Sequence, residues 1–280
     1  MIKKIFSIFI CLLCFGCFSS KDTKPQILVT IPPYASLVRS LVGDQVDVQI
    51  FVPPGVNPHT YEPSPAQIKH FAQAKVWFRI GDPIENKMVH FLEQHHVQIV
   101  DLSKNTHDEQ DLHLWLNPSI VIEQVEEMMP ILIEQFPEIA SILKNNCAKL
   151  KTELKQLDSE ISSKLTSFQG RYLLVSHPAL GYYCQRYGLH QLSVEVEGKD
   201  PLPQDIAHLM SELKIHPVPV VLIEPQYNKK GAVLIADKLH IPSEEINPYA
   251  EDYFGMLNYL TEIIIKHYKP IYTERGPSNL

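Results

Sequence analysis

The chain has 280 residues, of which 45% are hydrophobic and 20% charged, and its formal net charge is -7. This length accommodates two ordinary domains, and the composition is that of a globular rather than a disordered protein. The negative charge argues against a nucleic-acid partner. The sequence contains neither a Walker A motif nor a Rossmann glycine fingerprint, so nucleotide chemistry has no support.

Residues 1–17 predict an export signal of the lipoprotein type. Two lysines precede an apolar core, residues 5–15, that is too short to span a membrane as a stable helix. A Gly-Cys pair then resembles a lipoprotein cleavage site, although Cys14 stands where leucine is usual. We expect a lipid anchor on Cys17, a polar tether over 18–25 and a periplasmic or other extracytoplasmic location. Ordinary secretory cleavage nearby is the alternative.

The first half of the mature chain alternates short apolar runs with amphipathic segments. The apolar runs predict β-strands, and the segments between them predict helices. Strands are expected at 27–31, 46–52, 76–80 and 97–102, with helices at about 34–42, from 64 onward and at about 84–95. This βα alternation indicates an N-terminal lobe over 26–116 built on a parallel sheet.

The middle of the chain, 117–169, predicts linking helices. Residues 117–135 have a helical pattern, Pro137 interrupts it, and 138–168 continue it. One apolar stripe recurs at spacings of three and four in the second segment: Leu150, Leu154, Leu157, Ile161 and Leu165. A helix of ~30 residues is roughly 45 Å long, so this segment predicts a rigid strut between two lobes.

The second half repeats the βα alternation and predicts a C-terminal lobe over 170–270, followed by a tail over 271–280. Strands are expected at 172–176, 192–196 and 218–223, with a short one ending at 246, and helices at 179–187, 203–213, 229–239 and 253–268. Cys147 and Cys184 are the cysteines left after the signal. The sequence leaves open whether they form a disulfide or remain two separate thiols.

Three histidines follow predicted strands or lie in the loops beyond them. They are His59, His113 and His177, and Asn247 follows the last strand of the second half in the same way. The carboxyl ends of parallel strands form the ligand-binding edge of an open α/β sheet. Neutral imidazole is the commonest protein metal ligand. Two lobes that face each other at these edges would therefore enclose one metal ion.

Several segments are similar to the metal-specific substrate-binding proteins of bacterial ABC transporters, the zinc/manganese family also called cluster A-I or the lipoprotein-receptor antigen family. The matching segments are VNPHTYEPSP at 56–65, DLHLWLNP at 111–118, SHPALGYY at 176–183, EGKDP at 197–201 and IEPQ at 223–226. The resemblance covers nearly the whole mature chain in order. It implies an α/β fold of two (β/α)4 lobes with parallel sheets, joined by a long backbone helix, with the metal site between the lobes.

The resemblance implies that His59, His113 and His177 are ligands. The fourth ligand of the family is usually an Asp followed by Pro near the last strand, and this chain has Asn247 there. Asn before Pro is also typical of a turn, so Asn247 is either a ligand or a turn-forming residue. Because an amide oxygen is a weaker ligand than a carboxylate, water or Glu62 is the alternative fourth donor. Glu197 and Glu224 are expected to hydrogen-bond a ligand imidazole or to lie between the lobes, and a polar strand end is the alternative for Glu224.

Three imidazoles favour Zn²⁺ over Mn²⁺, which prefers more oxygen ligands, and manganese-selective relatives tend to have Glu in place of His177. We therefore expect a monomeric, non-enzymatic zinc-binding protein that delivers its ion to a membrane ABC permease, with Mn²⁺ or Fe²⁺ as the alternative cargo. A zinc hydrolase with three His ligands is the alternative of a different class. It would need Glu62 or Glu224 as general base, and the chain has no His-Glu-x-x-His motif.

Overall fold

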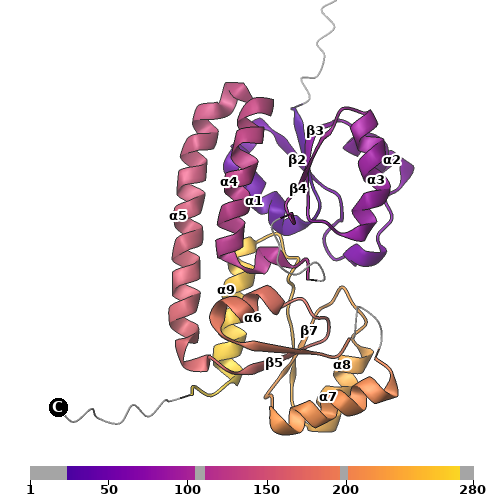
Figure 1. Ribbon diagram of the computed structural model, residues 1–280, viewed down its shortest axis with the longest axis vertical. Helices are drawn as coiled ribbons and strands as arrows, with labels where there is room; N and C mark the ends of the chain where they lie inside the picture. Colours follow the sequence, from indigo (N-terminus) through magenta and orange to yellow (C-terminus); the bar gives the residue numbers. More distant parts are fainter. Residues whose placement is uncertain (1–23, 105–110, 196–200, 272–280) are drawn as a thin grey trace, which may run out of the picture.

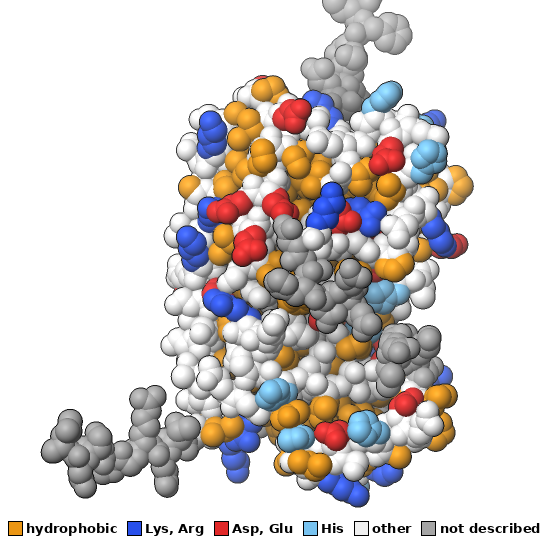
Figure 2. Space-filling model, viewed as in Figure 1, with side chains coloured by type: hydrophobic (Ala, Val, Ile, Leu, Met, Phe, Trp, Pro, Cys, Tyr) orange, Lys and Arg blue, Asp and Glu red, His pale blue; other side chains and the backbone are white. Residues whose placement is uncertain are grey.

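The computed structural model describes residues 24–104, 111–195 and 201–271. The predicted export signal, the anchor at Cys17, most of the tether and most of the tail lie outside the described residues. Within the described part, no helix has the length and apolar character needed to cross a membrane. Figure 2 shows acidic and basic side chains interspersed over one face of the molecule.

The N-terminal lobe contains a four-stranded sheet in the order β2-β1-β3-β4, with every neighbouring pair parallel. Helices cover both faces of the sheet (Figure 1). The strands are β1 (Gln26–Val29), β2 (Asp47–Ile50), β3 (Ala74–Arg79) and β4 (Gln98–Asp101), and the helices are α1 (Pro32–Val42), α2 (Pro65–Phe71) and α3 (Pro83–Gln94). Each of these helices has proline in its first turn, where the missing N–H costs little.

The C-terminal lobe repeats the arrangement in the order β6-β5-β7-β8, again with parallel pairs throughout. The strands are β5 (Tyr172–Val175), β6 (His190–Ser193), β7 (Val221–Ile223) and β8 (Ser243–Glu245). The helices are α6 (Gly181–Tyr187), α7 (Pro203–Ile215), α8 (Lys230–Leu239) and α9 (Tyr253–His267). The prediction of two (β/α)4 lobes is therefore confirmed.

Two helices, α4 (Pro118–Gln135) and α5 (Ala140–Leu165), link the lobes, and the short 3-10 helix Pro137–Ile139 separates them. At 1.5 Å per residue, the 26 residues of α5 extend about 39 Å. The predicted apolar stripe of α5 is buried throughout. The helix packs against α4, against α1 of the first lobe and against α9 of the second, as Figure 1 also shows. The predicted long backbone helix is confirmed.

One apolar core runs through both lobes and the linking helices. It includes β1 and β3, the stripe of α5 and most buried residues of α9. A second, smaller core lies between the other face of the C-terminal sheet and helices α7 and α8. The lobes are thus joined by continuous packing as well as by the chain, which restricts their relative movement.

Some predicted boundaries are wrong by a few residues, for local reasons. The strand expected at 218–223 begins only at Val221, because Pro219 has no N–H to donate to a sheet. The strand expected at 192–196 is β6, at His190–Ser193, because Gly188 ends α6 in a left-handed conformation and the chain enters the sheet at once. Cys147 and Cys184 are both free thiols.

Candidate metal centre

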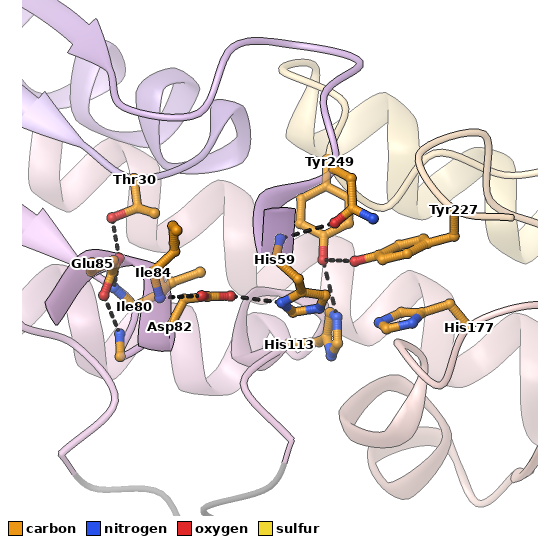
Figure 3. A network of polar contacts seen from close by, with 12 residues as sticks. Thr30, His59, Ile80, Asp82, Ile84, Glu85, His113, His177, Tyr227 and Tyr249 are labelled. Atoms are coloured by element: carbon orange, nitrogen blue, oxygen red, sulfur yellow. Dashed lines mark hydrogen bonds and ion pairs between the residues drawn. The ribbon is translucent and has the colours of Figure 1, made fainter. Parts of the chain in front are cut away.

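The three histidines come from three loops and meet between the lobes. His59 lies in the 3-10 helix Pro58–Thr60 beyond β2, His113 lies between β4 and the 3-10 helix Leu114–Leu116, and His177 follows β5. Their potential ligand atoms all lie within 4.8 Å of one another. Figure 3 shows the imidazoles converging, His113 and His59 from one lobe and His177 from the other. A zinc ion held by three imidazoles would have zinc–nitrogen bonds of about 2.0–2.1 Å.

The first imidazole, that of His59, is held by a carboxylate. Its Nδ1 lies 2.9 Å from Oδ2 of Asp82, which follows β3 and is almost fully buried. The other carboxylate oxygen of Asp82 accepts a hydrogen bond from the N–H of Ile84 in the first turn of α3. Burial opposes ionisation of Asp82, but the hydrogen bonds from His59 and Ile84 outweigh it and lower the pKa of this carboxyl. Asp82 is therefore an ionised acceptor that fixes the ring.

The second imidazole, that of His113, is held by Asp111 in the same loop. Oδ1 of Asp111 accepts from the backbone N–H of His113 at 3.0 Å and lies 2.8 Å from its Nδ1. The ring is almost fully buried and packs beside the indole of Trp115, with centroids 5.2 Å apart. Local hydrogen bonding therefore sets both the backbone and the ring orientation of this residue.

The third imidazole, that of His177, is held by Glu195, whose Oε2 lies 2.8 Å from Nδ1. The Tyr227 ring stacks on the imidazole at a centroid distance of 3.7 Å and an interplanar angle of 8°. Burial lowers the pKa of His177 to about 4, although the hydrogen bond to Glu195 raises it in part. His177 is therefore neutral at physiological pH, which is the state that binds metal.

The three carboxylates fix the tautomer of the three rings. A carboxylate only accepts hydrogen bonds, so each Nδ1 carries the hydrogen and each Nε2 keeps its lone pair. Nε2 of His177 has no hydrogen-bond partner in the described part of the chain, although it is buried. Metal-binding histidines commonly donate their other ring N–H to a carboxylate in this way. The cluster is therefore arranged so that three ring nitrogens could hold a metal ion.

Two tyrosines border the cluster from the C-terminal lobe. The Tyr249 hydroxyl lies 3.1 Å from Nε2 of His113, and the Tyr227 hydroxyl lies 2.7 Å from that of Tyr249. Both side chains are largely buried, and burial raises both pKa values well above the ordinary value for tyrosine. Both hydroxyls therefore keep their hydrogens at neutral pH.

The two other predicted donors are engaged elsewhere. Oδ1 of Asn247 accepts hydrogen bonds from Nε2 of Gln226 at 2.6 Å and from the backbone N–H of Tyr249 at 3.1 Å. The Glu62 side chain is 75% exposed and pairs with Lys87 at 3.1 Å. Glu62 does not belong to the histidine group, and Asn247 has no lone pair free for an ion.

Glu224 does not hydrogen-bond any of the three imidazoles, although such a bond was expected of Glu224 and Glu197. Glu197 lies outside the described residues. Neither oxygen of the fully buried Glu224 carboxyl hydrogen-bonds a ring; burial, and then the nearby Glu195, raise its pKa well above the ordinary value. The sequence interpretation missed Glu195, Asp82 and Asp111, which are the carboxylates that orient the rings.

The two lobes, the backbone helix and the inter-lobe histidines define the class of metal-binding substrate-binding proteins of ABC transporters. Residues 27–267 match the model of one family, described as zinc-uptake complex component A, periplasmic, or ZnuA. The chain belongs to this family, as its sequence motifs predict.

Individual relatives agree with this assignment. A putative metal-binding protein of Chlamydia trachomatis is 31% identical over 245 residues, which are 84% of this chain and 89% of that protein. The high-affinity zinc uptake system protein ZnuA of Bacillus subtilis is 24% identical over 284 residues, with 88% of this chain and 89% of that protein covered. A crystal structure of ZnuA superposes with a TM-score of 0.82 at 28% identity, covering 88% of this chain and 99% of the other.

Proposed function

We propose that this protein captures a divalent metal ion, with zinc as the preferred cargo, outside the cytoplasm and delivers it to the permease of an ABC importer. His59, His113 and His177 are the protein's nitrogen ligands. The observation that carries the proposal is the convergence of these three rings, each oriented by its own carboxylate, between two lobes. Relatives described as zinc uptake proteins support the same role.

The donor set favours zinc over manganese. The cluster has three imidazoles and no carboxylate ligand among the described residues. Imidazole nitrogen suits Zn²⁺, whereas Mn²⁺ favours carboxylate, carbonyl and water oxygens. Manganese and ferrous iron remain the competing cargoes, and they would give the same transport role.

A binding role also fits the cluster better than hydrolysis. A zinc hydrolase needs a general base within reach of a metal-bound water. Of the two candidate bases, Glu62 is exposed and paired with Lys87, and Glu224 is completely buried. The proposed location follows the family description, with a lipid anchor at Cys17 that holds a monomer beside its permease.

Competitive titration of the mature protein with Zn²⁺ and Mn²⁺ tests the proposed cargo. We expect near-stoichiometric zinc binding, with zinc displacing manganese, because nitrogen donors dominate the site. Metal analysis of the purified protein gives an independent measure. Preference for manganese or iron would overturn the choice of zinc and keep the transport role. Absence of tight binding of any divalent ion would overturn the whole proposal.

Substitution of Glu195 by glutamine is expected to weaken zinc binding by about 10–100-fold, the usual cost of losing a residue that orients a metal ligand. The carboxylate fixes the His177 tautomer, and an amide at the same place also presents a hydrogen-bond donor to Nδ1. Chelator competition measures the affinity. Glu138→Gln, at an exposed position of the 3-10 helix between α4 and α5, is the matched control. Equal affinities in the two variants would contradict the assigned role.

A further inference from the structure

The three imidazoles leave the fourth position of a tetrahedral zinc site to another donor. Two donors bound to one tetrahedral zinc at about 2.0–2.1 Å are about 3.3 Å apart. The Tyr249 hydroxyl oxygen lies 3.1 Å from Nε2 of His113, which is close to this separation. Figure 3 shows the Tyr249 hydroxyl directed toward the rings of the histidine cluster.

The loop that follows β8 holds Tyr249 in this position. Oδ1 of Asn247 accepts the backbone N–H of Tyr249, so the chain turns at Asn247 and Pro248. Nε1 of Trp115 donates to the carbonyl of Pro248 at 2.8 Å, and the Trp115 ring lies 5.2 Å from that of Tyr249. Trp115 belongs to the His113 loop, so the tyrosine is fixed relative to a ligand of the other lobe.

The Tyr249 hydroxyl can bind an ion without losing its proton, because its hydrogen can point to either of two partners. Without metal, Nε2 of His113 has a lone pair, so the Tyr249 hydroxyl donates to it and accepts from Tyr227. When an ion takes the lone pair of Nε2, the Tyr227 hydrogen turns away from Tyr249, and the Tyr249 hydrogen turns to the Tyr227 oxygen 2.7 Å away. A lone pair of Tyr249 then faces the ion.

We propose that the hydroxyl oxygen of Tyr249 is the fourth donor to the bound metal ion and that Tyr227 supports it as its hydrogen-bond partner. This inference rests on the proposed function, since it completes the same site. The inference places the fourth donor at Tyr249, two residues after Asn247 in the same loop. Asn247 instead makes the turn that orients Tyr249, and Glu62 stays in its exposed ion pair.

The test uses Co²⁺ in place of zinc, because cobalt is paramagnetic and reports bound water. Electron paramagnetic resonance spectra are recorded in ordinary water and in water enriched in oxygen-17, which broadens the signal when water binds the ion. We expect no broadening in the wild type. In Tyr249→Phe we expect broadening, since water replaces the hydroxyl, together with a zinc affinity about 10–100-fold lower.

Two further variants are matched to Tyr249→Phe. Tyr259→Phe removes an exposed hydroxyl from α9 and should change neither measurement. Tyr227→Phe should leave the cobalt signal unbroadened and weaken zinc binding less than Tyr249→Phe does. A change of affinity in Tyr249→Phe without oxygen-17 broadening would mean a structural role and would overturn the inference.

The remaining outcomes separate this inference from the proposed function. Broadening in the wild type would show that water is the fourth donor. Unchanged affinity and spectrum in Tyr249→Phe would assign the position to another residue, which Asn247→Ala and Glu62→Gln would then identify. Either result overturns the role of Tyr249 and leaves metal capture intact. A wild-type protein that binds neither cobalt nor zinc would overturn both.

Discussion

Replacement of His177 by alanine is expected to lower zinc affinity by more than about 100-fold. This exceeds the upper end of the cost of removing a residue that only orients a ligand, because the substitution removes a donor itself. His177 is also the only one of the three proposed nitrogen ligands that the C-terminal lobe supplies. Its loss leaves the site with the two histidines of the N-terminal lobe and leaves the buried Glu195 carboxylate without its ring partner.

Chelator competition with the metal-free protein measures this loss. His208→Ala is the control, because His208 is an exposed histidine of α7 in the same lobe. We expect the control to bind zinc as the wild type does. Circular dichroism of both variants separates lost binding from lost folding. Wild-type affinity in His177→Ala would remove this residue from the ligand set and move the site elsewhere.

The regular part of the fold was predictable from the sequence because its signals are local. The stripe from Leu150 to Leu165 has helical spacing, and the structure buries every member of it in α5. Strand boundaries were less accurate, because they depend on pairing with neighbours. The strand expected at 46–52 ends at Ile50 in the structure, although the Phe51 N–H still donates a hydrogen bond to the Val29 carbonyl.

The histidines were predictable because each lies beyond a strand within a recognisable motif. Glu195 was not, since its partner is 18 residues away. The parallel register pairs Val175 of β5 with Ser193 of β6, so continuing it by two residues places His177 beside Glu195. The proximity of His177 and Glu195 can therefore be predicted only when the pairing of β5 with β6 is known. Tyr249, the proposed fourth donor, was not predicted, because the family pattern directs attention to Asn247.

The stability of the metal-free protein should fall as the pH is lowered from about 6.5 to about 4. In the folded protein the pKa of His177 is about 4, because burial opposes its charged form, whereas the unfolded chain has the ordinary value of 6.5. Between these values the unfolded state binds more protons than the folded state, so acid favours unfolding. The difference corresponds to about 3 kcal/mol of unfolding free energy from this one residue.

Urea denaturation at pH 7, 5.5 and 4 measures this dependence, with His177→Gln as the comparison. Glutamine does not titrate, and its amide still offers a donor to Glu195, so the variant should lose less stability than the wild type as the pH falls. Protonation of other groups affects both proteins equally, so it cancels when the two pH dependences of the unfolding free energy are subtracted. Parallel pH profiles would show that His177 is not the source. A smaller loss in the variant would mean that folding free energy keeps the third imidazole neutral, and therefore ready for metal, in mildly acidic surroundings.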